Sequence, residues 1–355
     1  MAHGRPSKEP PVVNVLVLGT SSDAPPPGLP ERRTGARYWF ANNATALGSA
    51  LPETDVIFHW QDRTALLRAA WPAAQRLRWI HAAGVGVDWT IFPELVASDV
   101  ILTNCRGVFD RSIPEYVLGL MLLFAKDFPG TLQAQRQRRW RHRPAEVLAG
   151  THAVVVGAGS IGRSIARLLR LLGVQVTLVA RHERPNDPEF GWIRASNDLA
   201  AAAAVADWLI LALPLTPETR GLIGRDVLAA LEPAARLINV GRGAVVDEAA
   251  LIDALRHGRL AGAGLDVFER EPLPRNHPFW SLPGVVVSPH MAGDVHGWLA
   301  WFTNSFLANL ERWLAGQPLA NVVDKQLGYV PESDGSDRAG DAGRAIQIKP
   351  HRGQC

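Results

Sequence analysis

The sequence Val154-Val-Val-Gly157-Ala-Gly159-Ser-Ile-Gly162 decides the fold of this chain. It follows an apolar run and opens an amphipathic one, residues 163–173, and this context makes a G-x-G-x-x-G pattern informative. Gly157 permits a tight turn, Gly159 lets a pyrophosphate approach the backbone, and Gly162 lets the helix pack against the strand. The first amides of the helix would then bind the phosphates. The stretch predicts a dinucleotide-binding turn; a glycine-rich turn without a ligand is the alternative.

Short apolar, β-branched runs recur on both sides of this motif, separated by helical stretches such as the alanine run 200–204. Continuous apolar runs are typical of strands buried on both faces of a parallel sheet. An α/β protein with two doubly wound parallel-sheet domains would use all of these runs. The expected strands span residues 12–18, 55–59, 78–81, 100–103, 152–156, 175–179, 208–213, 237–240, 264–267 and 285–288.

Length and composition agree with two globular domains. The chain has 355 residues, of which 47% are hydrophobic and 20% charged, values typical of a soluble globular protein. The most apolar helical stretch, residues 113–125, is shorter than the roughly 20 residues of a membrane span. Only Cys105 and Cys355 are present, so we expect a reducing, cytoplasmic location without disulfides. Residues 1–11 and 331–355 lack apolar periodicity and are expected to be disordered tails.

The charge of the chain is nearly balanced, with a formal net charge of +3. Its positive excess is local, because one segment without acids carries Arg136, Arg138, Arg139, Arg141 and Arg143. Such a run is usually a solvated helix face or an oligomer contact, and no nucleic-acid motif accompanies it. We therefore expect no nucleic-acid or membrane partner, and no motif predicts a metal site.

The end of the next strand bears on the choice of dinucleotide. An NAD site normally places an acid there to bind the ribose 2′-hydroxyl. Here Ala180 occupies that position and Arg181-His-Glu-Arg184 follows. A carboxylate would repel a 2′-phosphate, whereas an arginine can bind one. The pattern favours NADP(H) and leaves NAD(H) possible, with Arg181 stacking on adenine and Glu183 serving the ribose.

Three later segments place polar residues at the carboxyl ends of buried strands, where open α/β sheets bind ligands. They are Leu237-Ile-Asn-Val-Gly-Arg242-Gly, Gly264-Leu-Asp-Val-Phe-Glu-Arg-Glu271-Pro and Val287-Ser-Pro-His290-Met-Ala-Gly293. Arg242 could clamp a carboxylate, and His290 could exchange a proton near neutral pH. Glu271 could fix the tautomer of His290 and favour its protonated form.

Each of these residues also has a plain structural interpretation. A histidine after proline is more often a loop or core residue, a glutamate before proline is usually solvated, and an arginine between glycines can cap a helix. Their order after a dinucleotide-binding motif favours the catalytic interpretation.

Over residues 12–330 the chain resembles the D-isomer-specific 2-hydroxyacid dehydrogenases, and especially the glyoxylate/hydroxypyruvate reductases. The likeness rests on the glycine motif, on residues 237–251 and 265–273, and on Ser288-Pro-His-Met-Ala-Gly293. It implies that Arg242 binds the substrate carboxylate, that His290 is the general acid/base and that Glu271 is its partner. It also implies that Asp266 contacts the nicotinamide.

The resemblance implies a substrate loop at Val85 and Gly86, and a reaction that interconverts a small 2-oxo acid and its D-2-hydroxy acid. It further implies a Rossmann NAD(P)-binding domain, 104–296, inserted into a flavodoxin-like substrate domain, 12–103 and 297–330, and a homodimer. The residues expected at the cofactor are Gly157, Gly159, Ser160, Ile161, Gly162, Arg181, Val240, Asp266, His290 and Gly293.

Two other functions share this framework. Formate dehydrogenases carry glutamine where Glu271 stands here, which argues against that activity. Corepressor-like relatives bind NAD(H) without catalysis and retain the same triad, but this chain has no recognisable peptide-docking or nuclear segment. The sequence does not identify the residues of the substrate pocket. Trp60, Trp140, Trp298 and Trp301 could line it, and Trp140 could reach a partner's site.

Overall fold

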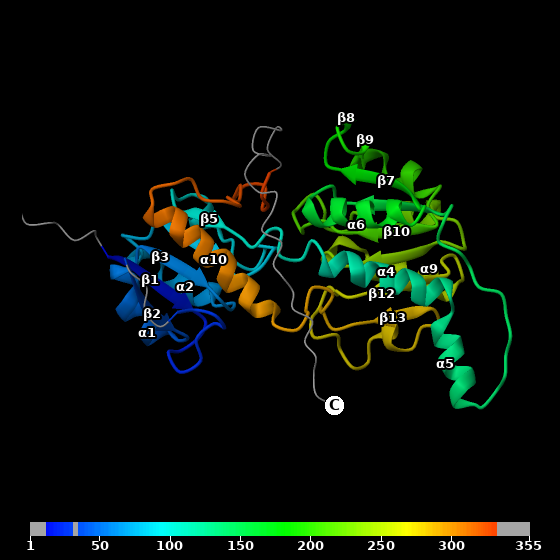
Figure 1. Ribbon diagram of the computed structural model, residues 1–355, viewed down its shortest axis with the longest axis horizontal. Coiled ribbons are helices and arrows are strands. Elements are labelled where there is room, and N and C mark those ends of the chain that lie inside the picture. The colour runs from blue at the N-terminus through cyan, green and yellow to red at the C-terminus, as the bar shows by residue number, and fades with distance from the viewer. Residues whose placement is uncertain (1–11, 31–34, 332–355) are drawn as a thin grey trace, which may run out of the picture.

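The computed structural model describes residues 12–30 and 35–331 of the chain (Figure 1). The segments predicted to be tails, 1–11 and 331–355, lie outside the described residues apart from Pro331. The molecule has two halves, each built on one largely parallel sheet (Figure 1), which confirms the predicted α/β class. The first half contains the five-stranded sheet and the second half the eight-stranded sheet.

The first sheet has five strands in the order β2-β1-β3-β4-β5, all of them parallel. Both of its faces are covered. The short helices pack on one face through Leu47, Leu67 and Leu95. The long helix α10 (Trp298–Leu314) packs on the other face through Phe302 and Phe306. The strands are β1 (Val13–Leu18), β2 (Ala36–Ala41), β3 (Val56–His59), β4 (Trp79–Ala82) and β5 (Ile101–Thr103). The helices are α1 (Ala44–Ala50), η1 (Leu51–Glu53), α2 (Thr64–Ala70), η2 (Trp71–Ala73), α3 (Pro93–Val96) and α10 (Trp298–Leu314).

The second sheet has eight strands in the order β13-β12-β11-β10-β6-β7-β9-β8. Its strands are parallel except for the outermost pair, β8 and β9, which is antiparallel. The strands are β6 (His152–Val156), β7 (Gln175–Ala180), β8 (Arg184–Asp187), β9 (Gly191–Ala195), β10 (Trp208–Leu211), β11 (Arg236–Asn239), β12 (Gly262–Leu265) and β13 (Val285–Val287).

Helices α4 and α6 cover one face of this sheet, and α7, α8 and α9 cover the other. Helix α5 and the loop that follows it project from the far side of this half of the molecule (Figure 1). The helices are α4 (Ser112–Ala125), α5 (Phe128–Arg136), α6 (Ser160–Leu171), η3 (Ser196–Asp198), α7 (Leu199–Ala203), α8 (Arg225–Ala230), η4 (Gly243–Val245), α9 (Glu248–Arg256) and η5 (Pro278–Trp280).

All of the predicted strands form, with ends shifted by a few residues, and the alanine run lies in α7. Strands β2, β8 and β9 were not predicted from the sequence. Strand β2 lies at the sheet edge and is only partly buried, and its short aromatic run, Tyr38-Trp-Phe, has no β-branched residue. Strand β8 reads Arg-Pro-Asn-Asp, a composition that disfavours strands. The antiparallel β8–β9 pair corrects the expectation that the sheets are wholly parallel.

The chain passes from the first sheet to the second after β5 and returns with α10. Beyond α10, Val323 N donates to Leu102 O at 2.8 Å, so the returning segment rejoins the edge of the first sheet. The boundaries at residues 103 and 296 stay a prediction. Within the described ranges, no helix combines the length and apolar character needed to cross a bilayer.

Cys105 is fully buried in the first half of the molecule, and its thiol is not disulfide-bonded. Burial raises the pKa of this thiol to about 12, so the thiolate is not populated near neutral pH. Cys355 lies outside the described residues.

Candidate active site

A cleft of about 600 Å³ runs between the two halves of the molecule. Its walls come from loops at the carboxyl ends of strands in both sheets and from the starts of α4 and α10, the position at which parallel sheets bind ligands. The predicted residues that line it are Val85, Gly86, Gly157, Gly159, Ser160, Ile161, Arg181, Val240, Arg242, Asp266, His290 and Gly293.

The glycine motif forms the turn between β6 and α6. Gly157 has φ +111°, and a Cβ there would lie 2.3 Å from Ala212 O. A Cβ on Gly162 would lie 1.8 Å from Gly157 O, so helix and turn touch backbone to backbone. At Gly159, by contrast, a Cβ would meet nothing within 4 Å. The turn is therefore closed toward the protein and open toward the cleft, which fits a bound pyrophosphate at the start of α6.

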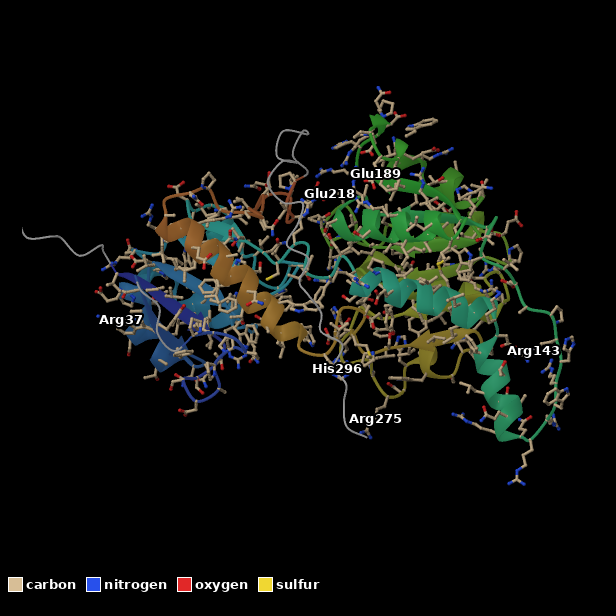
Figure 2. All side chains as sticks on the ribbon, viewed as in Figure 1. Arg37, Arg143, Glu189, Glu218, Arg275 and His296 are labelled. Carbon is tan, nitrogen blue, oxygen red and sulfur yellow. The ribbon has the colours of Figure 1, made fainter. Side chains whose placement is uncertain are left out.

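The far end of the cleft lies beyond β7. Arg181, Arg184 and Ser196 line it, while Ala180 leaves the end of the strand without a carboxylate. Arg181 Nη2 lies 4.0 Å from Glu218 Oε1, and Figure 2 places Glu218 on the side that faces the other half of the molecule. Glu183 accepts a hydrogen bond from the exposed Trp192 Nε1 at 2.7 Å, so it is engaged away from Arg181.

His290 and Glu271 form the predicted pair. Their Nδ1 and Oε2 atoms are 2.7 Å apart, and Phe268 N donates to Glu271 Oε1 at 3.0 Å. The hydrogen bond to Glu271 raises the pKa of His290 above its ordinary 6.5 against the effect of burial. Burial raises the pKa of Glu271, but the bonds from His290 and Phe268 outweigh it and leave this pKa below its ordinary value. The His290 side chain is still 48% exposed, so a substrate can reach it.

Asp266 is buried at the end of β12 and fastens the loop that carries His290. Its Oδ1 accepts from Ser288 Oγ at 2.6 Å and from Met291 N at 2.9 Å, and its Oδ2 accepts from Ala292 N at 2.8 Å. His290 N donates to Asp266 O at 2.8 Å. This residue therefore positions the loop on both sides of His290. The predicted contact with a nicotinamide stays a prediction.

Arg242 connects the two halves of the molecule through Asp88. Its Nε donates to Asp88 Oδ1 at 3.1 Å and Oδ2 at 3.2 Å, and its Nη2 lies 3.1 Å from Oδ1. Its Nη1 donates to Gly241 O at 2.9 Å. A guanidinium has five N–H groups, so these contacts leave one hydrogen on each terminal nitrogen for a ligand.

The predicted substrate loop lies directly against Arg242. A Cβ on Gly86 would be 1.9 Å from Arg242 Nη2, so glycine allows this approach. The carbonyl oxygens of the loop are bound by the protein: Trp89 Nε1 donates to Gly86 O at 2.9 Å, and Asn104 Nδ2 donates to Val85 O at 2.5 Å. The structure thus brings together two sequence motifs that lie more than 150 residues apart.

Of the tryptophans considered for the pocket, Trp298 lines the cleft and Trp60, Trp140 and Trp301 do not. Trp298 packs edge-to-face on Phe302, with ring centroids 5.1 Å apart. Trp140 is 100% exposed, on the loop after α5. Figure 2 places Arg143 of the same segment at the far side of the molecule.

Several lining residues escaped the sequence analysis. Asp88 stands two residues after the predicted substrate loop at Val85 and Gly86, and Arg184 ends the basic run, so both stood beside predicted sites without an assigned role. Asp294, Trp89 and Tyr329 carried no recognisable signal. Within residues 12–30 and 35–331, no cluster of three or more His, Cys, Asp or Glu side chains could hold a metal ion.

Residues 118–292 match the family model described as "D-isomer specific 2-hydroxyacid dehydrogenase, NAD binding domain". The chain is 33% identical over 310 residues to glyoxylate/hydroxypyruvate reductase A of Serratia proteamaculans, covering 83% of this chain and 96% of that protein. It is 35% identical over 259 residues to glyoxylate/hydroxypyruvate reductase B of Pectobacterium atrosepticum, covering 72% and 81%. The chain belongs to the D-isomer specific 2-hydroxyacid dehydrogenase family.

Solved structures of this family agree. A family member from Xanthobacter autotrophicus Py2 in complex with NADPH and MES aligns with a TM-score of 0.72 and 31% identity, over 89% of this chain and 99% of that chain. An NADPH-dependent glyoxylate/hydroxypyruvate reductase from Sinorhizobium meliloti, with NADP and sulfate, aligns with a TM-score of 0.74 and 27% identity, over 89% and 100%. The present chain is an NAD(P)-dependent 2-hydroxyacid dehydrogenase.

Proposed function

We propose that this dehydrogenase reduces a small 2-oxo acid of the glyoxylate or hydroxypyruvate type to its D-2-hydroxy acid with NADPH. The observation that carries the proposal is the His290–Glu271 pair, whose histidine lines the same cleft as Arg242 and the glycine turn. The names of the two relatives above support this substrate class. Glu271, in place of the glutamine of formate dehydrogenases, supports a site that works with a protonated histidine.

Arg242 and the substrate loop bind the carboxylate of the 2-oxo acid. The two terminal hydrogens of Arg242 that Asp88 and Gly241 leave available would form a bidentate pair with a carboxylate. Asp88 holds the guanidinium in place from its other edge. The Val85–Gly86 backbone lies beside Arg242, because Gly86 permits this close approach, and its amides would bind the same carboxylate.

His290 supplies the proton. A bound nicotinamide cofactor supplies the hydride for C2 of the substrate. As charge develops on the carbonyl oxygen, protonated His290 donates to it, and the raised pKa keeps that proton available near neutral pH. Glu271 stabilises the imidazolium before transfer and fixes which ring nitrogen faces the cleft.

The basic end of the cleft supports a preference for NADPH over NADH. Arg181 and Arg184 line the region beyond β7 where the adenosine ribose of a Rossmann ligand lies, and Ala180 stands in the place of the usual acid. The two solved structures named above contain NADPH or NADP.

The assembly and the domain limits belong to the same proposal. We infer a homodimer through the segment around α5, where Trp140 is fully exposed, and an NAD(P)-binding domain at 104–296 inserted into a substrate domain. A cytoplasmic location remains a prediction from the cysteine usage. Trp140→Ala should alter sedimentation or substrate preference, and a variant unchanged in both would remove the role of Trp140.

An assay of cofactor oxidation tests the activity. Glyoxylate, hydroxypyruvate, pyruvate, phenylpyruvate and 2-oxoisocaproate are each offered with NADPH and NADH. We expect the highest kcat/KM with NADPH and glyoxylate or hydroxypyruvate. No turnover with any acid would overturn the catalytic proposal in favour of a binding protein, and a faster reaction with NADH would overturn the cofactor preference alone.

A further inference from the structure

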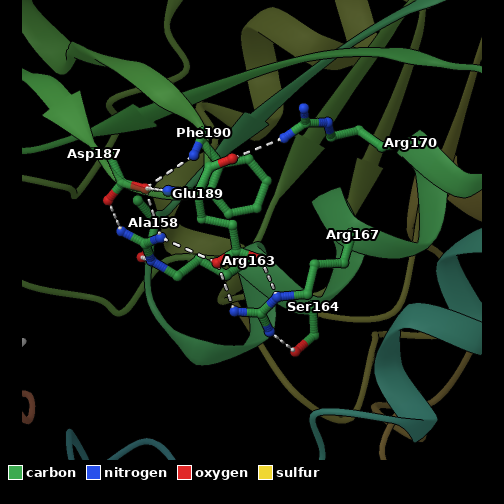
Figure 3. Close-up of polar contacts among 8 residues, drawn as sticks. All are labelled: Ala158, Arg163, Ser164, Arg167, Arg170, Asp187, Glu189 and Phe190. Atoms are coloured by element: carbon green, nitrogen blue, oxygen red, sulfur yellow. Dashed lines mark hydrogen bonds and ion pairs between the residues drawn. The ribbon is translucent and has the colours of Figure 1, made fainter. Parts of the chain in front are cut away.

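A buried ion pair connects the cofactor helix to the hairpin of β8 and β9. The Arg163 side chain, on the first turn of α6, is 8% exposed, and that of Asp187, at the end of β8, is 5% exposed. Arg163 Nη1 donates to Asp187 Oδ1 at 3.1 Å, and its Nη2 donates to Oδ2 (Figure 3). Arg163 thus holds the carboxylate with both terminal nitrogens.

The same guanidinium reaches the glycine turn. Arg163 Nε donates to Ala158 O at 3.0 Å, and Ala158 lies between Gly157 and Gly159. Arg163 therefore bonds the turn that faces the pyrophosphate and the hairpin at the same time. A lysine, with a single ammonium group, cannot reproduce this planar three-point geometry.

Asp187 in turn organises the hairpin. Its Oδ1 accepts from Glu189 N at 3.1 Å and Phe190 N at 3.0 Å. The Phe190 ring lies 5.4 Å from the guanidinium carbons of both Arg163 and Arg170. Arg167 adds an ion pair to Glu189, Nη2 to Oε2 at 2.8 Å. Side chains of α6 thus attach the tip of the hairpin at several points.

The backbone attaches the hairpin only weakly. Strand β9 pairs with β7 at just two positions, Val179↔Arg194 and Ala180↔Ala195. The β8–β9 ladder is irregular between Arg184 and Asp187. Because so few strand hydrogen bonds fix it, the position of the hairpin depends on its contacts with α6.

The hairpin also builds the adenosine end of the cleft. Arg181 precedes it, Arg184 opens β8, and Ser196 follows β9, and all three line the cleft. We infer that Arg163 and Asp187 are positioning residues that set this basic wall at a fixed distance from the glycine turn, and thereby determine the discrimination between NADPH and NADH. The inference rests on the proposed cofactor preference.

The mechanism follows from the geometry. A 2′-phosphorylated cofactor must contact the glycine turn with its pyrophosphate and the arginines beyond β7 with its 2′-phosphate. Hydrogen bonds to a phosphate weaken steeply with distance and angle, so a shift of the hairpin costs NADPH affinity. NADH has no 2′-phosphate and depends on the turn alone, so it responds to loss of the Arg163 bond to Ala158 O but not to the position of the hairpin. Loss of the Arg163–Asp187 pair should therefore affect the two cofactors unequally.

Two variants test this, each assayed with glyoxylate. Arg163→Lys keeps the charge and loses the planar contacts. Because a lone buried charge can unfold the chain, Arg163→Met combined with Asp187→Asn removes both charges and keeps the acceptor for Glu189 N and Phe190 N. The matched control is Arg194→Met on β9 of the same hairpin, which removes an exposed ion pair to Asp198 and a contact with the Trp192 ring. Arg194 does not line the cleft.

For both test variants we expect KM for NADPH to rise about tenfold, which corresponds to one lost charge-assisted contact. We expect KM for NADH and kcat to change by about twofold or less. The control should match the wild type. A purely structural pair would lower kcat for both cofactors through a smaller active fraction and leave the KM ratio unchanged, and that result would overturn the inference.

The wild-type measurement separates this inference from the proposed function. A wild type that favours NADH would overturn the NADPH preference, whereas the positioning role is judged by the change in the KM ratio between wild type and variants. A ratio unchanged within about twofold in a folded double variant contradicts the positioning role whichever cofactor the wild type favours.

Discussion

The two ends of the cleft are held in place by different means. At the cofactor end, which comprises the glycine turn and the adenosine region beyond β7, backbone touches backbone around Gly157 and Gly162, and a buried ion pair fixes the adjoining hairpin. At the catalytic end, partly exposed side chains form ion pairs: His290–Glu271 within one half of the molecule and Arg242–Asp88 between the two halves. The first end depends on steric fit, so its variants should lose affinity or stability. The second depends on single functional groups, so its variants should lose chemistry and keep their fold.

The largest effect is expected at the catalytic end. His290→Gln removes the proton donor while the Asp266 carboxylate still binds the neighbouring amides. Turnover should fall by about 10²–10⁴-fold, with KM for NADPH and the thermal midpoint nearly unchanged. Steady-state kinetics and calorimetry check this. Turnover close to that of the wild type would remove His290 from the proposed mechanism.

Steric fit at the cofactor end is tested by two glycines in the same turn. Gly162→Ala would place a Cβ 1.8 Å from Gly157 O, and the overpacking should cost about 1–3 kcal/mol in free energy of unfolding. Gly159→Ala meets nothing within 4 Å, so stability should change by less than about 0.5 kcal/mol while NADPH binding weakens. Denaturant unfolding and cofactor titration separate the two. Equal stability losses would contradict the distinction.

A smaller effect is expected at Arg181, which offers charge rather than steric fit at the adenosine end. Arg181→Gln should raise KM for NADPH about tenfold, as for one lost charge-assisted bond, and KM for NADH by no more than about twofold. The exposed Arg256→Gln on α9 serves as the control for a change of one charge. Equal effects on both cofactors would show that Arg181 acts on the adenine instead.

The smallest effect is a change of pH profile. Glu271 raises the pKa of His290, so the proton needed for reduction persists to higher pH. The kcat/KM for reduction should be high at low pH and fall as the pH rises through this pKa. Glu271→Gln removes the main cause of the shift, so the falling limb should move to lower pH. Profiles measured from about pH 5 to 9 that coincide for both proteins would contradict the pairing.

The sequence predicted the fold well wherever burial determines composition. Strands such as β6 and β10 are buried on both faces, and their apolar runs are unmistakable. Strand β8 was missed because its residues have no strand preference and its place depends on Asp187 meeting Arg163, a contact between distant segments. Local sequence carries no signal for such a contact.

The individual residues of the candidate site could be predicted from the sequence, but the contacts between them were harder to predict. His290, Glu271 and Arg242 stood in recognisable motifs; His290 and Arg242 line one cleft, and Glu271 is hydrogen-bonded to His290. The partner of Arg242 could not be read from the sequence, because Asp88 lies in the other half of the molecule and a single acid in a glycine-rich loop is usually solvated. Its role emerges only when both sheets are folded.

The Arg242–Asp88 pair also bears on how ligands arrive. Because Asp88 neutralises Arg242 before any substrate binds, the catalytic end presents little net field to an approaching oxo acid. Arg181 near β7 is paired less closely, with its Nη2 4.0 Å from Glu218 Oε1, so it presents more of its charge to a cofactor that carries several phosphate charges. We expect cofactor association to slow markedly with rising ionic strength, and substrate association to respond only slightly. The charges of the cleft would thus favour loading of the cofactor before the acid it reduces.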